Sequence, residues 1–190
     1  MNNILKPINI GSIVIDDPVL LSPMAGVTDL PFRRLVKSFG AGLVTSEMIA
    51  SQAMIRDHKR THKMAKAESD EYLMSVQLAG YDPRMMAQAA RMNEEKGAQI
   101  IDINMGCPDR SIEKQGCGSA MIKTPEIAAA IIRAAKRGAG EMPVSVKTRL
   151  GYNEDELETW LPAILKEEPA VVTVHARTRK EMSKVPAQWE

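Results

Sequence analysis

Short runs rich in Val, Ile and Leu recur along the chain, and stretches that are apolar on one face only separate them. Runs of this kind are typical of strands buried in a parallel sheet. Six of them predict strands, over Pro18–Ala25, Leu43–Met48, Leu73–Ala79, Ile100–Met105, Pro143–Thr148 and Val171–His175. Successive runs begin 25, 30, 27, 43 and 28 residues apart, which indicates a strand–helix unit that repeats.

The stretches between the strands predict helices with recognisable beginnings. Four are expected, over Asp29–Phe39, Asp82–Lys96, Thr124–Arg137 and Glu154–Lys166. Asp29, Asp82 and Thr124 are residue types that favour the N-cap position, and a proline follows each of them within two residues. Upstream of the first strand, the segment Ile8–Ile15 with Gly11 at its turn predicts a small hairpin.

Alternating strands and helices fit either an open doubly wound sheet or a closed barrel. The first predicted strand runs into Ser22–Asp29, which lacks the Gly-x-Gly-x-x-Gly turn of a dinucleotide-binding fold. Polar residues instead gather at the carboxyl ends of the strands, where a barrel builds its active site. We therefore predict an α/β fold, a (β/α)8 TIM barrel, of which residues 1–190 form the N-terminal part with about the first six strand–helix units.

Composition narrows the class of protein. The chain has 190 residues, of which 44% are hydrophobic and 26% charged, as in soluble globular domains. No apolar run approaches the ~20 residues that cross a membrane, and the first residues do not resemble a signal peptide. Two cysteines are too few for a disulfide framework or a four-cysteine zinc site. We expect a cytoplasmic protein without a metal or membrane partner, and the net charge of +1 does not by itself identify any partner.

Candidate chemistry lies at the strand ends. Cys107 follows the fourth strand in a Gly-Cys-Pro turn, so it is either a nucleophile or proton donor at the barrel mouth or a small packing residue. Lys147 and Arg149 share one side-chain parity, so both point into the mouth unless they form surface salt bridges. His175 ends the sixth strand as a ligand, a donor or a structural residue. Gln77, between apolar neighbours, is expected to be a buried amide.

Two further segments have alternative interpretations. The long loop after the fourth strand contains Gly116–Ala120, which is a candidate lid, and Cys117 within it is interpreted as a packing residue. The stretch Arg56–Lys66 carries five Lys or Arg residues and one Asp. It is either a solvated helix face or an edge that contacts phosphates.

Five segments taken together resemble the tRNA-dihydrouridine synthases, in particular their bacterial B-type branch. They are Pro23-Met24-Ala25-Gly26-Val27-Thr28-Asp29, Gln77-Leu78-Ala79-Gly80, Asn104-Met105-Gly106-Cys107-Pro108, Lys147-Thr148-Arg149-Leu150-Gly151 and His175-Ala176-Arg177-Thr178-Arg179. Any one of these segments alone is a weak signal. Their order is highly specific, and the resemblance covers essentially the whole chain.

The resemblance implies an FMN-dependent oxidoreductase that reduces a uridine of tRNA to 5,6-dihydrouridine, with NADPH recharging the flavin. It assigns to the cofactor Pro23, Met24 and Ala25 along the isoalloxazine ring, and Gln77, Lys147 and His175 as hydrogen-bond partners. It assigns Asn104 and Arg149 to the target uracil. In the implied mechanism, hydride from flavin N5 adds at C6, and Cys107 donates a proton to C5. A thiol suits this step, since a serine would be too weak an acid.

The family pattern extends beyond the six strands read here. The resemblance implies two more strands, whose loops hold the FMN phosphate, and a C-terminal helical domain that docks tRNA. We expect a C-terminally truncated piece of a protein that is monomeric at full length, with weak FMN binding and poor solubility in isolation. Two alternatives stay open, a flavin-barrel dehydrogenase that acts on a free pyrimidine and a non-catalytic fragment. Turnover of tRNA against free pyrimidine tests the first, and a flavin absorption spectrum tests the second.

Overall fold

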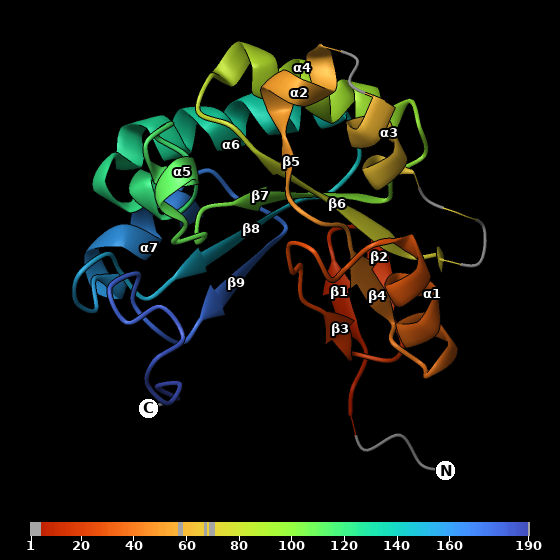
Figure 1. The fold of residues 1–190 in the computed structure, drawn as a ribbon, viewed down its shortest axis with the longest axis horizontal. Helices are drawn as coiled ribbons and strands as arrows, with labels where there is room; N and C mark the ends of the chain where they lie inside the picture. Colours follow the sequence, from red (N-terminus) through yellow and green to blue (C-terminus); the bar gives the residue numbers. More distant parts are fainter. Residues whose placement is uncertain (1–4, 57–58, 67, 69–70, 190) are drawn as a thin grey trace.

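A curled parallel sheet forms the centre of the molecule (Figure 1). The computed structural model describes residues 5–56, 59–66, 68 and 71–189. The strands follow the order β3-β4-β6-β7-β8-β9, with β5 beside β6, and the pairings within this sheet are parallel. Their bounds are β3 Leu20–Leu21, β4 Leu43–Thr45, β5 Ile49–Ala50, β6 Met74–Ala79, β7 Ile100–Asn104, β8 Val144–Arg149 and β9 Val171–His175. The sheet is a half-barrel, so the predicted barrel architecture with about six strand–helix units is confirmed.

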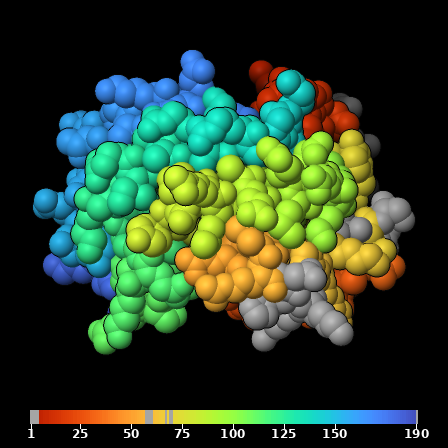
Figure 2. All heavy atoms as spheres, turned by 90° about the horizontal axis from the view of Figure 1, so that it is seen from above, coloured from red at the N-terminus to blue at the C-terminus, as the bar shows by residue number. Residues whose placement is uncertain are grey.

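Helices cover the outer face of this half-barrel. They are α1 Leu30–Ser38, α2 Ser51–Ile55, α3 Lys59–Ala65, α4 Pro83–Glu94, α5 Arg110–Glu113, the 3-10 helix η2 Gly118–Lys123, α6 Pro125–Ala139 and α7 Leu157–Leu165. The orange α2, the lime α4 and the teal α6 lie side by side as one layer when seen from above (Figure 2). Gly138 of α6 is in this contact, and a Cβ at that position would lie 2.0 Å from the carbonyl oxygen of Ala87 in α4. The two helix backbones therefore touch.

The capping residues begin two helices where the sequence predicts. The Asp29 carboxylate accepts a hydrogen bond from the Phe32 backbone N–H at 3.1 Å, which fixes the start of α1. Asp82 accepts in the same way from the Arg84 N–H at 2.8 Å at the start of α4. Thr124 occupies the N-cap position of α6, but its side chain makes no capping hydrogen bond.

The first barrel strand is shorter than predicted. The expected strand spans Pro18–Ala25, whereas in the structure only Leu20–Leu21 pair with β4. The chain turns immediately afterwards, because the N–H groups of Val27 and Thr28 donate to the Met24 carbonyl at 3.1 and 3.0 Å. This turn ends the extended conformation and carries the residues that follow the strand towards the carboxyl end of the sheet.

Short elements and one helix start also differ from the prediction. Helix α7 begins at Leu157 and not at Glu154, and the Asp155 carboxylate accepts from the Leu157 N–H at 3.0 Å at this start. The sequence analysis does not predict β5, α2, α5 or η2, and it gives the helix α3 only as one of two interpretations of Arg56–Lys66. Each of them spans seven residues or fewer, which is too short for a hydrophobic period to repeat.

An antiparallel hairpin closes the amino end of the half-barrel, as predicted. It consists of β1, Ile8–Ile10, and β2, Ile13–Ile15. The side chains of Ile10 and Ile15 are 2% and 1% exposed. They pack against apolar residues at the starts of three barrel strands, Leu43, Leu73 and Ile100. The hairpin therefore fills the end of the sheet opposite to the carboxyl ends of the strands.

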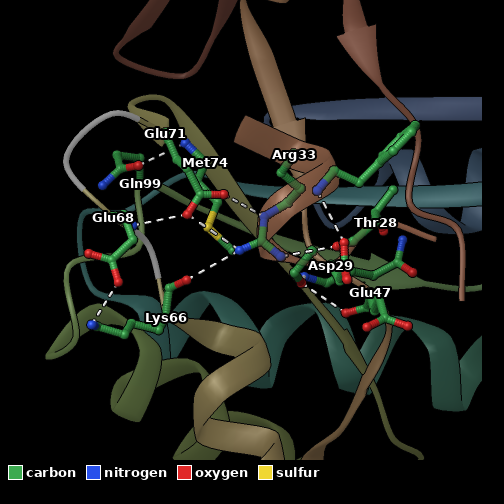
Figure 3. Close-up of polar contacts among 12 residues, drawn as sticks. Thr28, Asp29, Arg33, Glu47, Lys66, Glu68, Glu71, Met74 and Gln99 are labelled. Atoms are coloured by element: carbon green, nitrogen blue, oxygen red, sulfur yellow. Dashed lines mark hydrogen bonds and ion pairs between the residues drawn. The ribbon is translucent and has the colours of Figure 1, made fainter. Parts of the chain in front are cut away.

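A buried ion pair fixes α1 to the segment that precedes β6 (Figure 3). Arg33 Nε donates to Glu71 Oε1 at 2.7 Å, and the side chains are 1% and 0% exposed. The remaining guanidinium nitrogens donate to backbone carbonyls, Nη1 to Thr28 at 3.0 Å and Nη2 to Lys66 at 3.3 Å. Because arginine is rarely buried without such partners, the sequence analysis does not identify Arg33 as a core residue.

Candidate active site

A cavity of about 470 Å³ opens at the carboxyl ends of the barrel strands. The nine residues that the sequence analysis singles out for cofactor, substrate or catalysis all line it, namely Pro23, Met24, Ala25, Gln77, Asn104, Cys107, Lys147, Arg149 and His175. They follow or end β3, β6, β7, β8 and β9, which lie far apart in the sequence. The half-barrel therefore gathers them into one site, and Met48 and Ser183 also line it.

A chain of hydrogen bonds, which we call the Asp102 network, crosses the inner face of β6, β7 and β8. Gln77 Nε2 donates to Asp102 Oδ2 at 2.6 Å, and Asn104 Nδ2 donates to Gln77 Oε1 at 2.8 Å. Asn104 Oδ1 in turn accepts from the backbone N–H of Cys107 at 2.9 Å. Ser145 Oγ donates to the other Asp102 oxygen at 2.6 Å. The network reaches from a buried carboxylate to the turn that carries the cysteine.

A second set of contacts supports Cys107 from below. Its carbonyl oxygen accepts from the N–H of Ser119 at 3.0 Å and from the Ser119 hydroxyl at 2.9 Å. Gly118 has a φ of +62°, and a Cβ there would lie 2.6 Å from the same carbonyl, so glycine is required. Within the long loop that the sequence analysis interprets as a lid, residues 117–120 are buried under the Cys107 turn, so this part of the loop is packed against the protein.

The two cysteines differ in their surroundings. Cys107 is half-buried, and burial is the main cause that raises the pKa of its thiol, while the positive charge of Arg149 opposes this increase. Cys117 is 7% exposed, and burial raises its pKa to about 11. Its burial agrees with a packing role. Both thiols are therefore protonated at neutral pH, and only Cys107 lines the cavity.

The half-buried Lys147 lines the cavity, and the buried Asp102 lies beside it on the neighbouring strand. Burial lowers the pKa of Lys147, and the negative charge of Asp102 opposes that decrease. Burial likewise raises the pKa of Asp102, against hydrogen bonds from Gln77 and Ser145 and the charge of Lys147. Lys147 Nζ makes no hydrogen bond to any residue that the structure describes. This ammonium group is therefore available to a ligand.

His175 also lines the cavity, and one of its ring nitrogens has no hydrogen-bond partner among the described residues. Its Nε2 lies 3.4 Å from Arg177 Nη1, whereas its Nδ1 is buried without a hydrogen-bond partner among the described residues. Burial and the charges of Arg149, Lys147 and Arg177 lower the pKa of His175 to about 4, so the ring is neutral at pH 7. If Nε2 accepts from the Arg177 guanidinium, Nδ1 carries the proton and requires an acceptor.

Arg149 joins the loops that surround the cavity. Its Nε donates to the Gly106 carbonyl at 2.7 Å, and its Nη1 donates to the carbonyls of Thr178 and Met182 at 3.0 and 2.9 Å. Only Nη2 has no hydrogen-bond partner within the described part of the chain. The predicted parity is confirmed, since Lys147 and Arg149 both line the cavity. Two of the three guanidinium nitrogens of Arg149, however, donate to backbone carbonyls.

Comparison with known families agrees with this geometry. The family profile described as "Dihydrouridine synthase (Dus)" matches residues 20–190, which is most of the chain and includes all nine cavity residues. The chain belongs to the dihydrouridine synthase family.

Curated relatives of this dihydrouridine synthase chain carry the same description. A "Probable tRNA-dihydrouridine synthase" of Rickettsia bellii is 45% identical over 96% of this chain and 57% of its own length. A "tRNA-dihydrouridine synthase B" of Pseudomonas aeruginosa is 38% identical over 98% of this chain and 56% of its own length. The chain thus spans a little over half the length of these relatives, and the predicted resemblance to the B-type branch is confirmed.

Solved structures support the fold alone. The 6-hydroxypseudooxynicotine amine oxidase of Pseudomonas geniculata N1 superposes with a TM-score of 0.66 and 13% identity, over 93% of this chain and 38% of that one. A variant of NCR from Zymomonas mobilis superposes with a TM-score of 0.57 and 12% identity, over the whole chain and 72% of that structure. Likeness at this level of identity shows a shared architecture.

The sequence analysis does not identify two polar residues that belong to the hydrogen-bond network of this dihydrouridine synthase site. Asp102 and Ser145 lie on the inner face of β7 and β8 and face each other across the ladder. The signal that could have found them is strand parity, because Asp102 precedes Asn104 by two residues and Ser145 precedes Lys147 by two residues. Side chains two apart on a strand point to the same side, so each sits one step deeper in the barrel.

The described part of this family member contains no group of three or more His, Cys, Asp or Glu side chains that could hold a metal ion. Among the described residues, no helix is long and apolar enough to span a membrane. Of the basic stretch Arg56–Lys66, Asp57 and His58 lie outside the described residues. Arg56 and Lys63 are exposed, and the exposed Lys66 pairs with Glu68 at 2.7 Å.

Proposed function

We propose that this chain provides the catalytic cavity of a tRNA-dihydrouridine synthase, which reduces the C5–C6 double bond of a uridine in tRNA with FMN as cofactor and NADPH as reductant. One observation carries the proposal: Cys107, Lys147 and His175 line one cavity of about 470 Å³ at the carboxyl ends of the strands. Family membership supports the same chemistry. Because the substrate is tRNA, the proposed location is the cytoplasm.

The residues of the cavity fit a flavin. Pro23, Met24 and Ala25 offer a largely apolar wall for a ring system, and Met24 is 39% exposed. His175 lines the same cavity as a neutral imidazole and would hydrogen-bond to a flavin oxygen. Lys147 would place a positive charge beside the electron-rich part of the reduced ring. When bound, FMN supplies the hydride that adds to C6 of the uracil.

Cys107 is the proposed general acid. Its half-buried thiol keeps its proton at neutral pH, because burial raises its pKa. The two hydrogen bonds from Ser119 to the Cys107 carbonyl hold the turn, so the thiol faces the cavity from a fixed backbone. In the proposed reaction the thiol donates its proton to C5 of the uracil, and the Cys107 thiolate is left for reprotonation by solvent.

Asn104 and Arg149 are proposed to hold the target base. A uracil must leave its stack in the folded RNA before it can enter the cavity. Asn104 already uses one N–H and its oxygen within the Asp102 network, so its second N–H remains for a base carbonyl. The Nη2 group of Arg149 offers a second donor beside the cavity. Both groups would read the base edge that is paired in a duplex.

A Cys107→Ala variant tests this function. The purified variant should keep the absorption spectrum of bound FMN but lose dihydrouridine formation on a tRNA transcript with NADPH by about 100-fold or more. Cys117→Ala is the matched control and should retain activity, because Cys117 lies outside the cavity. An unchanged dihydrouridine yield in Cys107→Ala would falsify the acid role. Reduction of free uracil in place of tRNA would instead favour a pyrimidine dehydrogenase.

A further inference from the structure

Asp102 is buried at a place where stability alone does not account for a carboxylate. Its side chain is 6% exposed on the inner face of β7, where barrel interiors usually hold branched apolar residues. Gln77 and Ser145 each donate one hydrogen bond to it at 2.6 Å. Burial still raises its pKa, which means that the folded protein holds the charged form at a cost. The presence of a buried carboxylate at this position therefore needs an explanation other than stability.

The Asp102 network has one direction, which the carboxylate at one end and two backbone N–H groups at the other both favour. A carboxylate can only accept hydrogen bonds, so Gln77 must turn its Nε2 towards Asp102 and its Oε1 towards Asn104. Asn104 must then turn its Nδ2 to Gln77 and its Oδ1 to the Cys107 N–H at 2.9 Å. The same Oδ1 accepts from the Gly106 N–H at 3.2 Å. The carboxylate and the two backbone N–H groups therefore require the same orientation of both amides.

We propose that Asp102 is a positioning residue whose carboxylate, acting through Gln77 and Asn104, fixes the turn that presents the Cys107 thiol. Its importance for catalysis rests on the proposed function of Cys107. Its effect on the geometry and reactivity of the thiol is argued from the protein's own contacts alone. The matching register of Gln77 with Asp102 across β6 and β7 places the two side chains opposite each other, as the relay requires.

The variant Asp102→Asn removes one of the two determinants of this direction and leaves only the backbone N–H groups of Gly106 and Cys107. An asparagine presents one donor and one acceptor, so Gln77 and Asn104 can both reverse and still hydrogen-bond to each other. A reversed Asn104 turns its Nδ2 towards the N–H of Cys107, and two donors then face each other. The turn loosens and the thiol becomes less buried. Since burial is the main cause of the raised pKa of Cys107, loosening increases the thiolate fraction.

A compensating exchange restores the direction. In Asp102→Asn/Gln77→Glu the carboxylate moves to position 77, where it accepts from Asn104 Nδ2 as Gln77 Oε1 does in the wild type. The new asparagine then donates to position 77 and accepts from the Ser145 hydroxyl. The double variant should therefore behave like the wild type at Cys107, although each position has changed. A merely structural role for Asp102 predicts no such rescue.

The experiment measures the rate of Cys107 alkylation by iodoacetamide between pH 7 and pH 9.5, together with the melting temperature, in a Cys117→Ala background that leaves one thiol. At pH 8, Asp102→Asn should react on the order of three times faster, as for a pKa lowered by about 0.5. Its melting temperature should not fall, because a buried charge is removed. The double variant should return to the wild-type rate. Ser75→Ala is the control, since the buried Ser75 Oγ has no hydrogen-bond partner among the described residues.

Three results would overturn the proposal. The first is an alkylation rate in Asp102→Asn equal to that of the wild type. The second is a faster rate that appears only with a lower melting temperature, since general loosening would explain it. The third is a double variant that is folded but as reactive as Asp102→Asn, or one that does not fold. Dihydrouridine formation is not part of this assay, so failure of the proposed function and failure of this inference give separate results.

Discussion

Positive charge dominates the surroundings of His175. After burial, the charges of Arg149, Lys147 and Arg177 are the main causes that lower its pKa to about 4. Of the groups named in the Asp102 network, only Asp102 is acidic, and it lies one step deeper in the barrel. A cavity with this imbalance favours anionic ligands. A phosphate and a uracil that gains negative charge during reduction both meet that requirement, in agreement with the proposed function.

The lowered pKa of His175 predicts a pH-dependent stability. The unfolded imidazole has a pKa near 6.5 and takes up a proton below it, whereas the folded one stays neutral down to about pH 4. Stability is therefore lost as the pH falls from about 6.5 towards 4. In His175→Gln, the melting temperature should fall less over this interval. For a domain of this size, each kcal/mol of unfolding free energy that is not lost at low pH corresponds to a melting temperature higher by on the order of 2–4 °C. Identical pH profiles for the two proteins in thermal scans would contradict this account.

At the scale of elements, the packing of α4 against α6 sets how closely the backbones of these two outer helices approach each other. Gly138 lies inside α6 and allows the backbone of that helix to approach Ala87. Glycine normally destabilises a helix by about 0.5–1 kcal/mol relative to alanine. Its presence here is explained by the neighbouring helix, since the 2.0 Å separation leaves no room for a methyl group.

A Gly138→Ala substitution should therefore destabilise the protein despite its higher helix propensity. Overpacking against the α4 backbone is expected to cost about 1–3 kcal/mol. Urea unfolding should show a lower midpoint with an unchanged slope. Arg137→Ala in the same helix is the matched control, because Arg137 is exposed and its removal should change stability by no more than about 0.5 kcal/mol. A stabilised Gly138→Ala would show that the two helices separate freely.

The predictable elements are those whose pattern repeats. The sequence predicts strands β6 to β9 and helices α4 and α6 from apolar runs and capping residues, because each of these elements is long enough for its hydrophobic pattern to repeat. The nine cavity residues follow from strand parity and the family resemblance. Asp102 and Ser145 do not, since their role depends on the register that sets Gln77 beside Asp102 and Asp102 beside Ser145. A single sequence carries no direct record of that register.

At the scale of the whole molecule, charge is balanced overall and uneven locally. The net charge is +1, so attraction to RNA must come from particular basic side chains. Arg56 at the end of α2 and Lys63 on α3 are exposed. Lys63 also lines a second cavity with Glu47, and Glu47 directly precedes Met48 in the lining of the candidate active site. Lys63 therefore lies near one side of the candidate active site.

A double variant Arg56→Ser/Lys63→Ser tests whether these two side chains bind phosphates. If both do, the slope of log K for tRNA binding against log salt concentration should become shallower by about 1 for each phosphate that is no longer neutralised. Arg133→Ser on α6 is the control, because Arg133 is occupied by an ion pair with Glu167 at 2.5 Å on the outer layer. An unchanged slope would assign Arg56 and Lys63 to a solvated helix face.

The hydrogen bonds of Arg149 have a mechanical consequence. One guanidinium on β8 ties the Gly106 carbonyl, which follows β7, to the Thr178 and Met182 carbonyls, which follow β9. Loops that would otherwise fluctuate independently are thereby linked through one rigid planar group. A ligand that pulls one loop inwards must carry the others with it. The rim should then tighten as a single unit, so the first molecule to bind lowers the entropic cost of ordering for the second.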